Sequence, residues 1–390
     1  MIRRLTMHPG IFARSSILVS SWYLVAFSHA VAQSEIRPHF TTVMPGLEYA
    51  HLQITNRPWS IHVARLERSR KGFDVITTLG KGTIEGLSPL AAQIEAVPPK
   101  EGHPVVGVNG DFFVIKPGPY QGDPEGLQIL EGELVSAPSK VSFWVDHRKF
   151  HIEPVNSEFK ATLSDGKSTA FGLNETPKAD KAVLFTPIFG RSTRATNFLE
   201  VVLEKAGDGP WLPLRANQSY RLRVSALNAC GNTTLAPGQA VLTIGSRLTN
   251  LLSSIKVGGE LRISTGLSMD LSGTTAAIGG GPLLVHNGSA ERGSASAGTN
   301  SAALPRHPRT AIGFSSRYLF LVEVDGRQKE LSIGMTFPEL AELMKSLGCT
   351  EAMNLDGGGS STFWLNGKVM NSPSDKHERA LANAVIIVRK

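Results

Sequence analysis

The chain has 390 residues, of which 41% are hydrophobic and 19% are charged, and its formal net charge is +7. The Lys and Arg residues are scattered, so the composition does not favour a nucleic-acid-binding protein, which is expected to carry a dense basic stripe. A disulfide scaffold is excluded as well, because Cys230 and Cys349 are the only cysteines. A mildly basic surface does suit an anionic substrate.

The first residues have the pattern of a secretory signal peptide. They combine basic residues without acids, an apolar run and a small-residue site at Ala30-Val31-Ala32. Ser20 and Ser21 interrupt the apolar run, which falls short of the ~20 residues that a membrane span needs. We therefore predict a signal peptide over residues 1–32 and an exported protein, periplasmic or secreted, without a membrane span after cleavage.

The rest of the chain predicts a sheet-dominated α+β fold. Residues 33–46 are expected to be irregular, and from residue 47 onward short β-like runs such as residues 60–66 and 73–77 alternate with turns. The 39 Gly and 23 Pro are consistent with many tight turns. We expect a mostly antiparallel or mixed sheet core with few helices, forming one catalytic domain over residues 47–390.

Two helices are predicted from their boundary residues. One begins at Thr336, because Glu339 completes a capping box, and it stops at Gly348. The other has Ser88 as its N-cap and Pro89 in its first turn, and Pro98-Pro99 ends it. Each helix precedes a strand, and each strand runs into an Asn-x-Asp sequence. This repetition suggests a pseudo-symmetric pair of loops that meet in one active site.

The most informative stretch is Asn354-Leu355-Asp356-Gly357-Gly358-Gly359-Ser360-Ser361. Three successive glycines are expected where the backbone needs positive φ or where a ligand approaches it closely. Their N–H groups and the two serine hydroxyls could hold phosphate or sugar oxygens. A flexible turn without a ligand is the alternative. The stretch Gly279-Gly280-Gly281-Pro282 is a second candidate for close approach, although a bulge at a sheet edge would use the same residues.

Four motifs in order resemble the phosphodiester glycosidase family. The resemblance covers about residues 47–390, and its motifs are residues 108–113, residues 278–285, residues 308–313 and the Gly- and Ser-rich stretch. It implies hydrolysis of the bond between a sugar's anomeric carbon and a phosphodiester oxygen, which releases sugar and a phosphomonoester. Asp111 departs from the pattern, because glycine often stands there, so its role depends less on the resemblance than that of Asp356.

The residue types suggest how such chemistry would be divided. Asp356 and Asp111 are the candidate catalytic carboxylates, and Arg309 is the candidate cation for the phosphate because guanidinium can bind phosphate in a bidentate manner. Glu125, in a predicted turn, is given no role. The predicted substrate-binding residues are Asn109, Gly110, Gly280, Gly281, Thr310, Asn354, Gly357, Gly358, Gly359, Ser360 and Ser361. The structural alternatives are that Asp356 caps its own turn, Arg309 forms a surface ion pair and Asn109 satisfies loop backbone.

No cofactor is predicted, because the eleven histidines show no paired ligand spacing. A hard cation such as Ca²⁺, bound by Asp111, Asp356 and Asn oxygens, remains an open alternative. Two other functions remain open as well. An ordinary glycoside hydrolase acting on an exopolysaccharide would need a protonated carboxyl for the leaving oxygen. A noncatalytic glycan-binding factor in polysaccharide assembly would bind sugar without breaking a bond.

Overall fold

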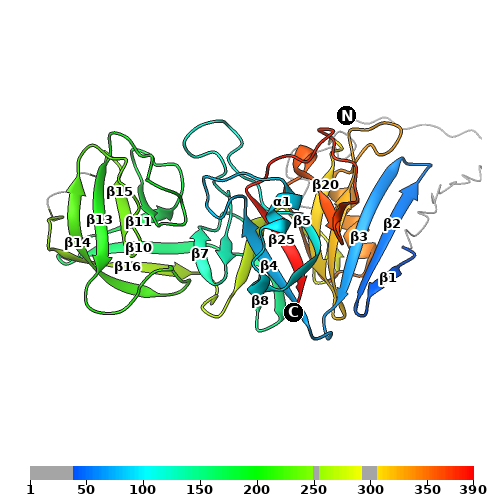
Figure 1. Ribbon diagram of the computed structural model, residues 1–390, viewed down its shortest axis with the longest axis horizontal. Coiled ribbons are helices and arrows are strands. Elements are labelled where there is room, and N and C mark those ends of the chain that lie inside the picture. Colours follow the sequence, from blue (N-terminus) through cyan, green and yellow to red (C-terminus); the bar gives the residue numbers. More distant parts are fainter. Residues whose placement is uncertain (1–37, 249–253, 292–304) are drawn as a thin grey trace, which may run out of the picture. The chain divides into compact units, whose positions relative to one another are not determined.

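The computed structural model describes residues 38–248, 254–291 and 305–390. The predicted signal peptide, residues 1–32, lies outside these ranges. The chain is 46% strand and 7% helical, so the predicted α+β class is wrong and the protein is nearly all β (Figure 1). The described α-helices, α1 (Leu90–Glu95) and α3 (Phe337–Ser346), have six and ten residues, and most connections between strands are turns without helix.

The described residues include an eight-stranded sheet, called sheet A. Every neighbouring pair of its strands is antiparallel. In spatial order its strands are β1 (Thr41–Met44), β2 (Leu47–Ile54), β3 (Trp59–Glu67), β21 (Tyr318–Val324), β20 (Arg309–Phe314), β22 (Glu351–Asn354), β18 (Leu283–His286) and β19 (Ser289–Ala290). The strand predicted over residues 60–66 is therefore confirmed. β1 lies within the segment that was expected to be irregular.

Two further sheets of five strands each occur in the described ranges. Sheet B contains, in spatial order, β24 (Lys368–Val369), β23 (Phe363–Leu365), β5 (His103–Asn109), β25 (Asn383–Arg389) and β4 (Phe73–Leu79). Sheet C contains β7 (Glu133–Ser136), β6 (Gln128–Leu130), β17 (Ala276–Gly280), β8 (Val141–Asp146) and β9 (Lys149–Pro154).

Sheets A, B and C share one hydrophobic core. Leu321 and Met353 from sheet A pack in the same buried cluster as Val108 and Phe363 from sheet B and Ile278 from sheet C. The opposite face of sheet A is covered by α3, and the opposite face of sheet B by α1. Because both faces of sheets A and B are covered, β3, β20 and β25 are buried almost along their whole lengths.

A closed barrel lies between β9 and β17 in the chain (Figure 1). Its strands are β10 (Ser157–Leu163), β11 (Ser168–Leu173), β12 (Ala182–Phe185), β15 (Ala240–Ile244), β13 (Leu199–Lys205), β14 (Ser219–Asn228) and β16 (Glu260–Leu267). Leu127 and Ile129 of the sheet C region pack in the same cluster as the barrel interior. None of the predicted site residues lies in the barrel strands, so the barrel contributes no side chain to the predicted site.

The helix boundaries separate one correct prediction from one error. Thr336 is the N-cap of α3, its capping box with Glu339 is present, and Gly348 follows the helix at φ 88°. Ser88 does not cap α1: the N-cap is Pro89, without a side-chain hydrogen bond. The backbone of Ser88 instead pairs with Leu381, which commits Ser88 to a β-bridge just before the helix begins. No helix within the described ranges is long and apolar enough to cross a bilayer.

The capping box of α3 gives a stability prediction. Thr336→Ala removes the acceptor for the Glu339 N–H, a hydrogen bond of 3.3 Å, and should lower the free energy of unfolding by about 1 kcal/mol. Thr336→Ser keeps the hydroxyl and should retain most of that stability. Urea unfolding of the two variants measures the difference, and equal losses in both would show that the cap does not contribute.

Candidate functional site

The Gly-rich stretch crosses from one sheet to another. β22, which precedes it, belongs to sheet A, and β23, which follows it, belongs to sheet B. The glycines therefore do not form a plain hairpin turn. Gly358 has φ 64°, and Gly358–Ser360 form a short 3-10 helix between the two strands. The true hairpin follows at Asn366-Gly367, where φ is positive at both residues and β23 pairs with β24.

The two Asn-x-Asp loops meet, as the sequence predicted. The Asn109 Nδ2 donates to the Asp356 carbonyl at 2.7 Å, and the Asp356 N–H donates to the Gly110 carbonyl at 2.9 Å. The Asn109 Oδ1 accepts from the Thr310 hydroxyl at 2.6 Å and from the Thr362 N–H at 3.1 Å. Asn109 is 1% exposed, so its side chain joins three segments of backbone and side chain and does not face solvent.

The second glycine stretch approaches protein backbone. The Gly281 N–H donates to the Asn354 carbonyl at 2.7 Å, and the Asn354 Nδ2 donates to the Gly281 carbonyl at 2.9 Å. A Cβ at Gly280 would lie 2.5 Å from the Asn354 carbonyl oxygen. Glycine is required at this position so that sheet C can pass close to the end of β22. Close approach was predicted correctly, but the partner of Gly280 is the chain itself.

Asp111 is a buried carboxyl at the end of β5, 3% exposed. Its Oδ1 accepts from the Phe112 N–H at 2.7 Å, and its own N–H donates to the Asn383 Oδ1 at 2.8 Å. The pKa of Asp111 is raised to about 7, mainly by burial; backbone hydrogen bonds from Phe112 and Gly126 oppose the rise, and the charges of Asp356 and Glu125 add to it. A Cβ at Gly279 would lie 2.4 Å from the Asp111 Oδ2, so glycine there makes room for the carboxyl group.

Asp356 is half-buried and lies where the Gly-rich stretch begins. Its Oδ1 accepts from the Gly357 N–H at 2.7 Å. Burial raises the pKa of Asp356, while hydrogen bonds from Ser360 and Gly357 and the positive charge of Arg379 oppose that increase. Negative charge on Asp356 in turn raises the pKa of Asp111, so the two carboxyls interact electrostatically. A pair whose environments differ in this way is suited to separate acid and base roles.

Three arginines approach the three glycines, one each. A Cβ at Gly357 would lie 3.8 Å from the Arg309 Cδ, one at Gly358 would lie 2.8 Å from an Arg327 nitrogen, and one at Gly359 would lie 2.0 Å from an Arg379 nitrogen. Gly358 and Gly359 thus permit guanidinium groups to lie against the loop, whereas at Gly357 the closest atom is the Pro308 carbonyl oxygen, at 2.7 Å from such a Cβ. Sequence reasoning missed Arg327 and Arg379, because each occurs in a charged run that is typical of a solvated loop.

The guanidinium of Arg309, the predicted phosphate cation, is engaged within the protein. Its Nε donates to the Met335 carbonyl at 2.9 Å, and its Cζ lies 3.9 Å from the centre of the Phe337 ring. Arg309 is 9% exposed, and burial lowers its pKa to about 10. Arg379 is more accessible: Asp375 binds its Nη2 at 2.7 Å, and its Nη1 donates to the Ser360 hydroxyl at 3.4 Å.

Most of the predicted substrate-binding residues have little solvent exposure. Asn354, Thr310 and Ser360 are each 0% exposed. Asp356 and Gly357 are half-buried, and Glu125 beside them is exposed. The Glu125 N–H donates to the Phe112 carbonyl at 2.9 Å, which fixes this third acid next to the Asp111 loop. The groups of the site that reach solvent are therefore Asp356, Gly357, Glu125, Arg327 and Arg379, whereas Arg309 and the polar residues named above are buried.

One large cavity and one candidate metal-binding group of the described residues do not include these site residues. A cavity of about 680 Å³ runs along β4 and is lined by none of the predicted site residues. Within the described ranges, the His, Cys, Asp and Glu side chains that gather closely enough to hold a metal are His62, Glu323 and Asp325. Asp111 and Asp356 are not among them.

Comparison with solved structures concerns the fold. A protein of Synechocystis superposes with a TM-score of 0.71 over 91% of this chain and 64% of that chain, at 17% sequence identity. At this identity the likeness establishes a shared architecture.

Comparison of sequences concerns the C-terminal part of the chain. Residues 232–388 match the model of the phosphodiester glycosidase family, so the resemblance is confirmed for this stretch. Over 68 residues, 17% of this chain, the sequence is 43% identical to N-acetylglucosamine-1-phosphodiester alpha-N-acetylglucosaminidase of Bos taurus. An uncharacterized prophage-derived protein of Bacillus subtilis is 43% identical over 83 residues, 21% of this chain. These matches span only 12% and 13% of the two relatives. The motif at residues 108–113 lies outside the matched stretch.

The raised pKa of Asp111 predicts a pH-dependent stability. An aspartate in an unfolded chain releases its proton near pH 4, whereas folded Asp111 holds it to about pH 7. Between these values the folded state binds more protons, so its stability falls as the pH rises. Asp111→Asn should remove this contribution, which is at most about 4 kcal/mol, and flatten the profile between pH 4 and 7. Urea unfolding across that range tests this, with the exposed-residue variant Asp208→Asn as control; unchanged pH dependence would contradict it.

Proposed function

We propose that this protein is an exported hydrolase that cleaves the sugar C1–O bond of a glycosyl phosphodiester in a cell-envelope or extracellular glycan. The observation that carries the proposal is the meeting of Asp111 and Asp356 at a Gly-rich crossing to which Arg327 and Arg379 lie close. Cations that can bind an anionic substrate thus lie beside carboxyl groups that can act on it. The family match of residues 232–388 supports the same reaction class.

The phosphate is bound by the arginine side of the site. Arg379 is held by two hydrogen bonds to the Asp375 Oδ2, at 3.0 and 2.7 Å, which orient its guanidinium beside Gly359. Arg327 lies beside Gly358. Planar guanidinium groups bind phosphate oxygens through paired, charge-assisted hydrogen bonds. We therefore assign phosphate recognition to Arg379 and Arg327. Arg309 is assigned a structural role, because its guanidinium contacts Met335 and Phe337.

The carboxyl side of the site acts on the anomeric carbon. Asp356 is half-buried, and the hydrogen bonds from Ser360 and Gly357 favour its ionised form against the effect of burial. We assign to this carboxylate the stabilisation of positive charge at C1 or the acceptance of a proton from the attacking water. The C1–O bond breaks, and its electron pair leaves with the phosphate oxygen. Because a phosphomonoester is a good leaving group, proton donation contributes less here than in ordinary glycoside hydrolysis. Asp111, with a pKa of about 7, supplies a proton reservoir beside Asp356.

The same observation keeps ordinary glycoside hydrolysis as the second candidate. A carboxyl group that holds its proton near neutral pH can act as the general acid that a sugar leaving group needs. A noncatalytic glycan-binding role would use the arginines without the carboxyls. Export is proposed from the signal-peptide pattern of residues 1–32.

Asp356→Asn is expected to reduce turnover of a glycosyl phosphodiester by at least about a hundredfold, a typical effect of losing charge stabilisation or acid–base chemistry. The amide keeps the size of the side chain, so the thermal midpoint should change little. Reaction of the wild-type protein in ¹⁸O-labelled water should place the label on the sugar. Label on the phosphate would identify a phosphodiesterase, and full activity of the variant would exclude the proposed role of Asp356.

Arg379→Gln should raise KM for a glycosyl phosphodiester by about tenfold or more, because a hydrogen bond to a charged group contributes about 1.5–3 kcal/mol. Its thermal midpoint should stay close to that of the wild type. Arg309→Gln should instead lower the thermal midpoint, because it breaks the buried contacts with Met335 and Phe337. Arg262→Gln, at an exposed position of the barrel strand β16, is the control and should change neither quantity. An unchanged KM in Arg379→Gln would show that another cation binds the phosphate.

A further inference from the structure

A second group of polar side chains lies on the face of sheet A that packs toward sheet B. His62 of β3 stands directly opposite Glu323 of β21 in the strand register. Asp325 follows Glu323 by two residues, so the alternation of a strand places both acids on one face. The next strands extend the row, because His51 is opposite His62 and Thr310 is opposite Glu323. Antiparallel pairing thus assembles one imidazole and two carboxyls from segments far apart in the chain.

All three side chains are removed from water. Glu323 is 0% exposed, Asp325 is 1% exposed and His62 is 2% exposed. Neither carboxylate oxygen of Glu323 has a hydrogen-bond partner. Asn371 lies nearby, but its Nδ2 donates to the Ser361 carbonyl at 3.1 Å and to the Asp325 Oδ1 at 3.5 Å, which commits both hydrogens. A buried carboxylate without a partner is unfavourable by several kcal/mol, so something must compensate Glu323.

The geometry fits a single bound ion. One ligand atom from each of His62, Glu323 and Asp325 lies within 4.8 Å of the others. Imidazole nitrogen and carboxylate oxygen bind Zn²⁺ at about 2.0–2.2 Å with tetrahedral geometry, so two ligand atoms of one ion are about 3.4 Å apart. The His62 Nε2 and the Asp325 Oδ2, at 3.6 Å, are already close to this separation. A small rotation of the side chains therefore brings all three atoms to an ion between them.

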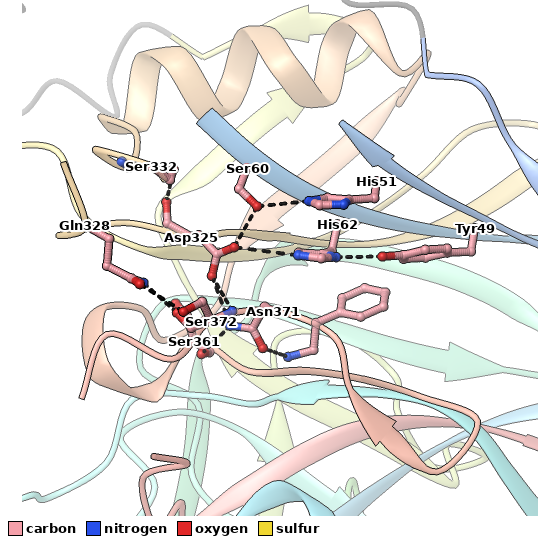
Figure 2. Close-up of polar contacts among 12 residues, drawn as sticks. Tyr49, His51, Ser60, His62, Asp325, Gln328, Ser332, Ser361, Asn371 and Ser372 are labelled. Atoms are coloured by element: carbon pink, nitrogen blue, oxygen red, sulfur yellow. Dashed lines mark hydrogen bonds and ion pairs between the residues drawn. The ribbon is translucent and has the colours of Figure 1, made fainter. Parts of the chain in front are cut away.

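The outer contacts of the group resemble the support of a metal centre (Figure 2). The His62 Nε2 faces the Asp325 Oδ2 at 3.6 Å, and the Nδ1 on the other side of the ring is 2.7 Å from the Tyr49 hydroxyl. This second contact holds the ring so that Nε2 stays directed at the carboxylates. Metal-binding histidines are usually held by their other nitrogen in this way. Asp325 is fixed in turn by the Ser60 hydroxyl at 2.7 Å and by the Ser372 N–H at 2.8 Å.

We propose that His62, Glu323 and Asp325 bind a divalent transition-metal ion of the Zn²⁺ or Mn²⁺ class. Two carboxylates balance the charge of such an ion when the imidazole is neutral, so the buried group becomes electrically neutral as a whole. The imidazole ligand favours this class over Ca²⁺, which prefers oxygen ligands alone. A proton on Glu323 is the competing solution, in which Asp325 is compensated by its contact with His62 at 3.6 Å and by the hydrogen bonds from Ser60 and Ser372. The metal content of the protein distinguishes the two solutions.

The ion would hold the segment that follows the Gly-rich crossing. Asp325 binds the Ser372 N–H, and Asn371 connects the Ser361 carbonyl to the Phe363 N–H, which donates to its Oδ1 at 2.9 Å. The site is therefore structural, placed behind the loop that presents Asp356. It does not depend on the proposed glycosidase reaction.

Metal analysis of the purified full-length chain tests the proposal. After removal of any affinity tag and dialysis against metal-free buffer, the wild-type protein should retain about one Zn or Mn ion per chain by inductively coupled plasma mass spectrometry. EDTA should lower the thermal midpoint, and ZnCl₂ or MnCl₂ should restore it. His62→Ala and Glu323→Gln should lose the ion. His286→Ala should keep it, because His286 is an exposed histidine with its own carboxylate partner, Glu351.

Three results would overturn the proposal. The first is wild-type protein without a bound ion whose thermal midpoint responds to neither ZnCl₂ nor MnCl₂. The second is a Glu323→Gln variant with the same metal content as the wild type. Higher stability of that variant would indicate that Glu323 carries a proton. The third is stabilisation by CaCl₂ alone. If a variant does not fold, the wild-type metal content and the response to EDTA still decide.

Discussion

The hydrogen bonds of the Asn109 side chain are the constraint on which the site depends. Through its two polar atoms it joins the Asp356 carbonyl, the Thr310 hydroxyl and the Thr362 N–H. These partners belong to both sides of the crossing between sheets A and B. Without a buried amide at this point, the backbone groups of the crossing would lie in the core without partners, at a cost of about 1–3 kcal/mol each. Asn109 therefore makes it possible for the Gly-rich stretch to be buried and still present Asp356.

Around this junction, burial sets the chemistry of the acidic groups. Asp111 is enclosed by the backbone of Gly126 and Gly279, and it keeps its proton to about pH 7. Burial also raises the pKa of Asp356, but hydrogen bonds from Ser360 and Gly357 and the charge of Arg379 oppose that rise. The glycines serve two different purposes: Gly279, Gly280 and Gly357 make room for other parts of the chain, and Gly358 and Gly359 make room for guanidinium groups. As a result, the carboxyl of Asp356 lies at the start of the Gly-rich stretch, and the guanidinium groups of Arg327 and Arg379 contact its later glycines.

Sheet A connects this site to the proposed metal site. Thr310, whose hydroxyl binds Asn109, stands opposite Glu323 in the register, and Glu323 stands opposite His62. A single row of side chains thus runs from the Asn-x-Asp loops to the buried imidazole. The loop after Ser361 is held against the same row through Asn371 and Asp325.

The sequence by itself determined the local features whose signals are local. The capping box at Thr336, the strand at β3, the convergence of the two Asn-x-Asp loops and the family resemblance over residues 232–388 could all be predicted, because each depends on neighbouring residues or on a short motif. The α+β class was wrong, since the connections between strands are turns. Only the tertiary structure decided which cations reach the glycines and which acids lose their water. Arg379 and His62 carry no signal in the sequence, because their partners are brought to them by strand pairing and loop crossing between residues far apart in the chain.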